Sequence, residues 1–525
     1  MDTASLQQKV KVAVPTLILC WWVLRRARLS QSRLPRPPSP PGHWLLGHAL
    51  QLPDPSNPDA PHVDVLLLEW ARKYNWTVFS FWVPIVGRFI VAADPALVRQ
   101  ALVIENYPKS PTYGNLLPLL GEGSMLVAEG SEWAAKRRVF NPGFSPGFLR
   151  EVVATVAEKV QTLCEKCSQA ADSAEELGLH KATVDFTADV IAQVAFGEDW
   201  GTRGGRADAP SAAVAPTRQL MFELQYECTQ NQIIPWRIYT NLRSRLRIWR
   251  LQRLLDADMV AVVHRRIAAL SEEDGTSAPS GRKDILSLAL KQTQLDSSSG
   301  TLGSAEVSDV VAQMKTFFLA GHDTTSTMIS WAIWLLAMHP KVCEEVRAEV
   351  AKVLGPWGSD SSGLGMALPP TYEAFQECEY LEAVLQETLR LYPPAGSARY
   401  VSDPNATFAG MNIGNSILYL SHYVLHRHPA LWDEPDEFRP ERFLKGLATS
   451  EKRNADFDPF AFGPFSRGPR DCIGKYFAML EGKIAVAALV RGFDFSAVHH
   501  DETIAYRVTQ RPQKGARMRV RHRPQ

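Results

Sequence analysis

A single cysteine near the end of this 525-residue chain lies among residues that suit a reactive, metal-binding thiolate. Residues 465–474 read FSRGPRDCIG, so the permanent positive charge of Arg470 lies two positions before Cys472. The following residues, KYFAMLE, have a helical pattern, which places Cys472 at a helix N-terminus where the peptide dipoles favour an anionic sulfur. Phe465 can pack against the sulfur, while Gly468 and Gly474 allow the backbone to turn and to approach a flat cofactor. The pattern predicts a thiolate ligand rather than a buried structural thiol.

Zinc does not fit this cysteine, because a zinc site needs four ligands and no second Cys or His lies at ligand spacing. The motif F-x-x-G-x-R-x-C-x-G is met at every specified position and resembles the haem-binding signature of the cytochrome P-450 family, in its eukaryotic microsomal type. The resemblance implies haem b (iron protoporphyrin IX) with Cys472 as its axial thiolate ligand. It also implies that Arg470, Phe465 and Gly474 contact this cofactor.

A long stretch without proline, residues 305–339, predicts one continuous helix that Pro340 ends. Inside it the sequence AGHDTT places an acid and two hydroxyl residues, which compete for backbone hydrogen bonds, in a helix interior. Residues that disfavour a helix interior but lie within a predicted helix indicate a functional site. The segment resembles the family's A-G-x-D-T-T oxygen-activation motif. The resemblance implies that Gly321 lets the helix open beside the iron and that Asp323 and Thr324 relay protons to bound dioxygen.

Two further motifs are weak alone and gain meaning from the resemblance. Glu387 and Arg390 share a helix face, a spacing that by itself is typical of a solvated ion pair. The resemblance implies that they form a buried charge network with Arg442 of the sequence FRPERF, and that this network fixes the segment carrying the cysteine. Its role would be structural, and breaking it would cost about 3–5 kcal/mol.

Trp133 and Arg137 also share one face of a predicted helix, which a basic helix surface would explain equally well. They resemble the family's W-x-x-x-R pair, and this implies that both bind a haem propionate. Arg399, which follows the turn at Pro393 and Pro394, is assigned to the other propionate by the same resemblance.

The remaining sequence predicts a mainly α fold with a smaller β-rich part (α+β). This prediction fits the cytochrome P-450 fold, and the resemblance implies that the haem lies between the long central helix and the helix that follows the cysteine. Helical pattern dominates residues 95–104, 149–170, 184–197, 217–230, 243–270 and 341–354, and strand-like alternation appears at residues 77–93 and 409–420. No internal linker is evident, so residues 43–525 are expected to form a single haem-thiolate catalytic domain. The chain has 57 basic and 56 acidic residues, so it lacks the excess of positive charge that is typical of nucleic-acid-binding proteins. Seven scattered cysteines are typical of a reducing compartment.

The N-terminal residues predict a membrane anchor or targeting segment. Residues 12–24 carry no charge and are flanked on both sides by basic residues. This run is shorter than the roughly 20 residues of a full span, although flanking basic side chains and the Trp pair at 21–22 could extend it. Residues 1–33 are therefore interpreted as the anchor and residues 34–42 as a proline-rich hinge. The heavier basic flank after the run predicts the endoplasmic reticulum membrane with the catalytic body in the cytosol. The alternative is a transit peptide to a plastid or mitochondrion, because no acidic residue lies between positions 3 and 53.

The predicted activity follows from the thiolate, which pushes electron density onto iron and favours O–O cleavage. We expect a monooxygenase that inserts one atom of dioxygen into a lipophilic small-molecule substrate. Phe317 and Phe318, together with residues 395–398 and 111–124, are expected to line an apolar pocket. No flavin or dinucleotide motif is evident, so the electrons are expected from NADPH through a separate partner, an NADPH-cytochrome P-450 reductase or an equivalent donor. Lys136, Arg138 and two basic residues near the cysteine, Arg467 and Lys475, are the predicted docking face. The alternatives are a hydroperoxide-rearranging haem-thiolate enzyme and a non-catalytic haem sensor. Neither needs the acid–alcohol pair that Asp323 and Thr324 form.

Overall fold

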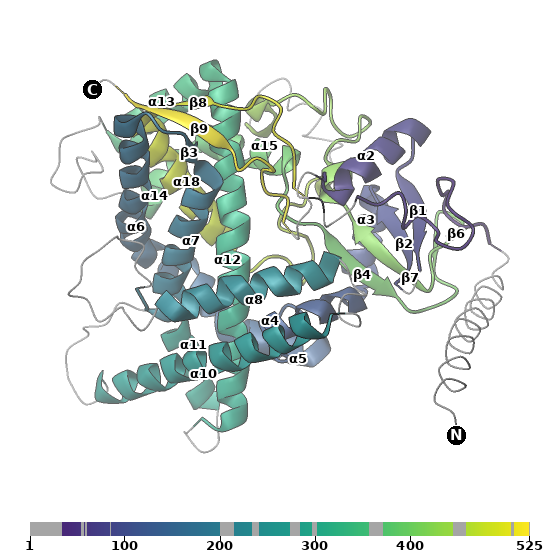
Figure 1. Cartoon of the computed structure of the whole chain (residues 1–525), viewed down its shortest axis with the longest axis horizontal. Helices are drawn as coiled ribbons and strands as arrows, with labels where there is room; N and C mark the ends of the chain where they lie inside the picture. Colours follow the sequence, from purple (N-terminus) through teal and green to yellow (C-terminus); the bar gives the residue numbers. More distant parts are fainter. Residues whose placement is uncertain are drawn as a thin grey trace, which may run out of the picture.

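A helical body and a smaller β-rich part lie side by side in the computed structural model of the chain (Figure 1). The structure describes residues 34–53, 57, 60–84, 86–199, 215–233, 241–273, 284–296, 302–355, 371–444, 458–505 and 509–523. The predicted anchor, residues 1–33, lies outside these described residues.

The helices of the described residues are α2 (Val63–Tyr74), α3 (Pro95–Arg99), α4 (Leu117–Leu120), α5 (Gly130–Phe140), α6 (Pro146–Ser173), α7 (Leu179–Phe196), α8 (Ala215–Ile233), α10 (Leu242–Glu273), α11 (Ile285–Asp296), α12 (Ser304–Met338), α13 (Pro340–Leu354), α14 (Tyr372–Glu377), α15 (Glu379–Leu391), α16 (His422–Leu425) and α18 (Lys475–Gly492). The strands are β1 (Val78–Val83), β2 (Gly87–Ala92), β3 (Leu177–Gly178), β4 (Ser397–Val401), β5 (Thr407–Phe408), β6 (Met411–Asn412), β7 (Ser416–Leu420), β8 (Phe493–Ala497) and β9 (Arg517–His522). The prediction of a mainly α fold with a smaller β part is confirmed.

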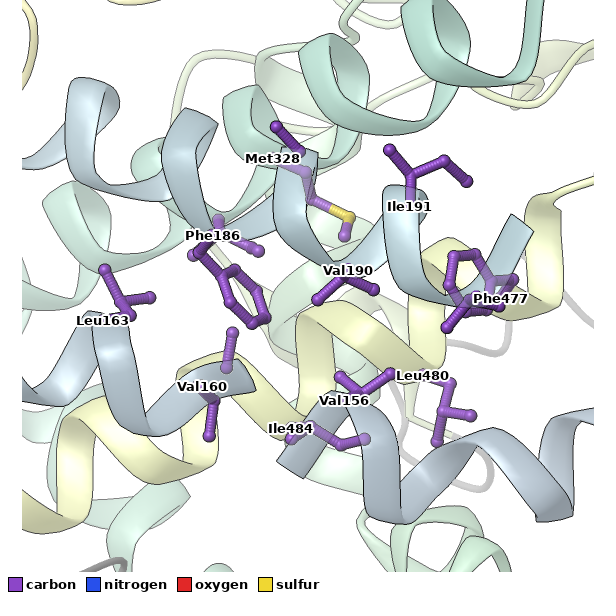
Figure 2. Packing of buried hydrophobic residues seen from close by; sticks show 14 of the residues in the cluster. Val156, Val160, Leu163, Phe186, Val190, Ile191, Met328, Phe477, Leu480 and Ile484 are labelled. Atoms are coloured by element: carbon purple, nitrogen blue, oxygen red, sulfur yellow. The ribbon is translucent and has the colours of Figure 1, made fainter. Parts of the chain in front are cut away.

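The central helix α12 runs through the helical body, and it is buried over most of its length from Val307 onward. It ends at Met338, and Pro340 then begins α13, because proline cannot extend a helix but suits a first turn. Figure 2 shows how the core is filled: aliphatic side chains of α6, Phe186 and Ile191 of α7, and Met328 of α12 pack around Phe477 and other apolar residues of α18. The helix that follows the cysteine is thus fixed against α12 by a shared core.

The β-rich part has its own core on a four-stranded sheet in the order β1-β2-β7-β4. β1 and β2 pair antiparallel, with Phe81 opposite Phe89, and β2 pairs in parallel with β7, with Ile90 opposite Leu418. A second sheet, β3-β9-β8, carries the C-terminal strand back onto the helical body. The site described below therefore draws on two separately packed cores.

The proline-rich residues after position 33 are hydrogen-bonded to the β-rich part. Ser80 of β1 donates its N–H to the carbonyl of Pro38 over 2.7 Å, and Asn412 donates to the carbonyl of Pro35 over 2.7 Å. Among the described residues, no helix has both the length and the apolar character needed to cross a bilayer.

Candidate active site

The loop that carries Cys472 is a tight turn placed immediately before α18. The N–H of Cys472 donates to the carbonyl of Phe465 over 2.9 Å, which closes the loop on itself. Gly468 has a φ of +80°, and a Cβ there would lie 2.7 Å from the carbonyl oxygen of Leu102, so only glycine fits. Gly474 has an ordinary φ of −87° and marks the start of the helix.

Cys472 differs from the other described cysteines in the exposure of the residue. Of the six cysteines in the described residues, five are buried and Cys472 is exposed. Protein surrounds the sulfur on most sides, so burial raises the pKa of its thiol, while a hydrogen bond from the Gly474 N–H and the charge of Arg137 lower it. Bonding to a metal ion would remove the proton outright. Within the described residues no cluster of three or more His, Cys, Asp or Glu is arranged to hold a metal ion.

Several cations converge next to this loop. Arg137 of α5 donates to the backbone carbonyl of Asp471 over 2.8 Å and to its carboxylate over 3.2 Å. The guanidinium of Arg470 lies 5.2 Å from the ring centroid of Trp133 and forms an ion pair with Glu129. The structure therefore brings Arg470 together with Trp133 and Arg137, the pair that the sequence analysis assigned to one haem propionate.

Arg399 and Lys109 belong to the same cation cluster, and fewer acidic side chains neutralise their charges than those of Arg137 and Arg470. Arg399 is 1% exposed, its Nη1 reaches only the carbonyl of Tyr107 at 3.4 Å, and its Nε has no hydrogen-bond partner within the described residues. Burial and the neighbouring charge of Arg470 lower the pKa of Arg399. Burial, followed by the charges of Arg399 and Arg470, lowers the pKa of Lys109 to about 7. Arg399 is buried, and the two acids beside this cluster, Glu129 and Asp471, are both partly exposed. The four cations outnumber these two acids, which fits the binding of the two carboxylates of a haem.

Lys109 was missed by the sequence analysis. It lies in an irregular segment, and its isolated β-bridge to Arg399 connects positions 290 residues apart. No local pattern marks such a residue.

The acid–alcohol pair lies on α12. The hydroxyl of Thr324 donates to the carbonyl of Ala320 over 2.7 Å, and the carboxylate of Asp323, which is 8% exposed, accepts a 2.9 Å hydrogen bond from Thr509. Gly321 has a packing reason to lack a side chain, because a Cβ there would lie 2.9 Å from two atoms of Ile191 on α7. Thr509 was also missed by the sequence analysis, since its segment has no motif.

The two phenylalanines expected to line the substrate pocket are packed instead. Phe317 is 5% exposed and meets the rings of Phe140 and Phe144 edge-on, at centroid distances of 5.1 and 5.6 Å. Phe318 is fully buried against Phe222 and His322. Both side chains pack against other rings inside the core, so the expectation that they line the substrate pocket is wrong.

The charge network of Glu387, Arg390 and Arg442 is assembled and buried. Glu387 binds Arg390 through two hydrogen bonds of 2.7 and 2.8 Å and accepts a third from Arg442 over 3.3 Å. The backbone N–H of Arg439 donates to the same carboxylate over 2.9 Å. Arg390 also donates to the carbonyls of Pro435 and Glu437, over 2.6 and 2.9 Å. The network thus holds the chain between α16 and the cysteine loop.

An exposed cysteine on a glycine turn, an adjacent cation cluster and an acid–alcohol pair in a long helix are the features that the resemblance to haem-thiolate proteins predicted. The chain belongs to the cytochrome P450 family, whose model matches residues 37–515. Similar proteins include cytochrome P450 4A24 of Sus scrofa, 30% identical over 87% of this chain and 85% of that protein, and cytochrome P450 4B1 of Rattus norvegicus, 29% identical over 90% and 87%. In fold it is similar to the crystal structure of the cytochrome P450DA heme domain, with a TM-score of 0.76 at 23% identity and coverage of 94% of this chain and 98% of that one.

Family membership establishes the class of reaction. The chain is a monooxygenase, an oxidoreductase that uses haem b held by a cysteine thiolate, dioxygen, a lipophilic substrate and an electron-transfer partner.

Proposed function

We propose that this chain hydroxylates a lipophilic small molecule, taking two electrons from NADPH through a separate reductase. The reaction balances as substrate-H, dioxygen, two electrons and two protons giving substrate-OH and water. The observation that carries the proposal is the combination of one exposed cysteine with a cation cluster beside it and a buried carboxylate next to a hydroxyl on α12.

The chain's own residues divide this task. Cys472 holds the iron, and Arg137, Arg399, Arg470 and Trp133 hold the haem carboxylates. When bound, the haem supplies the oxygen activation and the oxidation of a C–H bond. The protein supplies the two protons that the water product needs, and Asp323 with Thr324 is the group placed for this task.

Thr324 is suited to pass a proton because its hydroxyl can donate and accept at once. Its present donation to the Ala320 carbonyl is an i to i−4 bond that a rotation of the side chain can exchange for another acceptor. Gly321 lies directly against α7, where an added Cβ would be 2.9 Å from Ile191.

The electron donor would dock on the side of the cysteine loop. Arg138 is exposed on α5, and Lys475 begins α18 directly after the loop. Lys136 is less suited, because it is engaged with Asp309 at 2.9 Å and its side chain is only 12% exposed. The charge-reversal variant Arg138→Glu should slow turnover driven by the reductase and leave peroxide-driven turnover unchanged. Equal effects on both would rule the docking face out.

Residues 1–33 are proposed as the anchor in the endoplasmic reticulum membrane, with residues 43–525 as the catalytic body on the cytosolic side. The basic flank after the apolar run supports this orientation. Fractionation of cells that express the full chain, compared with a chain lacking residues 1–33, tests it. Recovery of the full chain in the soluble fraction would contradict the anchor.

Two variants test the reaction itself. Cys472→Ser should abolish the red-shifted absorption band of the reduced, carbon-monoxide-bound protein that sulfur ligation produces. Thr324→Val should keep that band and divert electrons from product to hydrogen peroxide. A rearranging enzyme or a haem sensor would show no NADPH-dependent product in the wild type, and normal coupling in Thr324→Val would refute the proton relay.

A further inference from the structure

The carboxylate of Asp323 is held from outside its own helix. Thr509 is the one side chain of the described residues that donates a hydrogen bond to it, from Oγ1 to Oδ2 over 2.9 Å. No cationic side chain of the described part of the chain lies within ion-pair distance of this carboxylate. Both partners are buried, at 8% exposure for Asp323 and 6% for Thr509. A buried carboxylate with a single neutral donor depends strongly on that donor for its orientation.

The backbone beside Thr509 is fixed at several points. The N–H of Gln510 donates to the carbonyl of Pro394 over 2.8 Å, and the indole N–H of Trp331 donates to the carbonyl of Gln510 over 2.9 Å. Trp331 lies on α12, as Asp323 does, and its ring stacks on Tyr392 with a centroid distance of 3.7 Å. The central helix thus holds residues 509 and 510 at two points.

The side chain of Gln510 reaches in the opposite direction, toward the β-rich part. Its amide donates to the carboxylate of Asp64 on α2, which is fully buried and also accepts hydrogen bonds from Ser421 over 2.8 Å and Tyr419 over 3.1 Å. The N–H of His62 donates to the carbonyl of Ile504 over 3.0 Å and attaches the same loop to the start of α2. Figure 1 shows this loop, between β8 and β9, lying between the helical body and α2.

We propose that Thr509 is a positioning residue for Asp323, and that the Asp64–Gln510 contact sets its place from the β-rich part. This inference rests on the proposed monooxygenase function, in which Asp323 supplies protons. Because Thr509 donates to Oδ2 and no side chain of the described residues donates to Oδ1, the proposal assigns proton exchange to Oδ1. Loss of the Thr509 hydroxyl lets the carboxylate rotate, and protons then arrive less often.

The test compares Thr509→Val, which has nearly the same shape without a hydroxyl, with Thr509→Ser, which keeps the hydroxyl. Thr293→Val is the matched control, because it removes a hydroxyl that bonds only to the Ala289 carbonyl of its own helix, α11. The first measurement is hydrogen peroxide released per product formed during NADPH-driven turnover, in water and in deuterium oxide. The second is the infrared stretching band of carbon monoxide bound to the reduced protein, which reports the local field and needs no substrate.

A hydrogen bond to a charged group is worth roughly a factor of ten or more in an equilibrium, so Thr509→Val is expected to release about ten times more peroxide per product, with a larger solvent isotope effect. Its carbon monoxide band should shift. Thr509→Ser and Thr293→Val should match the wild type in both measurements. If Thr509→Val does not fold, Thr509→Ala removes the hydroxyl without adding a buried methyl group next to the acid.

Two results would overturn the inference. One is a Thr509→Val protein whose peroxide ratio and carbon monoxide band match the wild type. The other is a Thr509→Ser protein that behaves like the valine variant, since the side chain would then act through packing. A wild-type protein with no reductase-driven product would instead contradict the proposed function, and the infrared comparison would still show whether Thr509 sets the orientation of Asp323.

Discussion

Glu387 offers a sharp test of what the buried charges contribute. The substitution Glu387→Gln keeps the shape of the side chain but leaves two guanidinium groups, Arg390 at 0% and Arg442 at 7% exposure, without their shared counter-charge. The carboxylate now accepts four hydrogen bonds, three from these side chains and one from the Arg439 N–H. Removing one partner of a buried ion pair costs about 3–5 kcal/mol, against a total stability on the order of 5–15 kcal/mol for a folded domain. About a fifth of the stability or more should therefore be lost.

Thermal unfolding followed by circular dichroism measures this loss, and the absorption of the reduced, carbon-monoxide-bound protein measures whether the cysteine loop still holds haem. Glu373→Gln is the matched control, because Glu373 also forms an ion pair with an arginine, Arg150 at 2.5 Å, but both side chains are more than half exposed. Water screens that pair, so its loss should leave unfolding unchanged. If Glu387→Gln does not fold, Arg442→Lys keeps the charge and loses the planar fork that reaches the carbonyls of residues 433 and 434. Equal unfolding temperatures for the two glutamine variants would refute the buried-charge argument.

Three further outcomes follow from the same geometry. Gly468→Ala should reduce haem retention, because it forces a side chain into a φ of +80° and a 2.7 Å contact with the Leu102 carbonyl. The control Gly147→Ala, whose Cβ would have one contact at 4.0 Å, should bind as much haem as the wild type. The haem absorption of the purified proteins measures both. Lys109→Met should speed haem transfer to an acceptor protein about tenfold, since it removes a charge-assisted contact to a haem carboxylate, and an unchanged rate would exclude this lysine from the site. Burial lowers the pKa of His422 from 6.5 to about 4, so the unfolded chain binds more protons than the folded one between these values. Stability should therefore fall by about 3 kcal/mol as pH drops from 6.5 to 4, and His422→Phe should flatten that dependence in pH-dependent denaturant unfolding.

The sequence predicted those parts of the site that are local in the chain. The cysteine loop and α12 each occupy one short segment, so residue order alone puts their side chains together, and the predicted helix of residues 305–339 differs from Ser304–Met338 by one residue at each end. The predicted helix of residues 95–104 was less accurate. It is α3 followed by a π-helical turn, Gln100–Ile104, whose Leu102 carbonyl lies against Gly468. A contact with a loop 366 positions away has no signature in a local pattern.

The residues that were missed share one physical feature: each acts across the boundary between the two cores. Lys109 joins the cation cluster through an isolated β-bridge to Arg399 of β4. Thr509 binds Asp323 of α12 next to Gln510, which is hydrogen-bonded to Asp64 of α2 and to Trp331 of α12. Such residues carry no periodicity, because their positions are set by tertiary contacts rather than by the helix or strand they belong to. In the proposed monooxygenase, the acid–alcohol motif on α12 is therefore only half of the proton-delivery group. The other half is a loop whose place is fixed by the β-rich part, so substitutions far from the cysteine, at the Asp64 contact, should affect the coupling of electrons to product more than they affect haem binding.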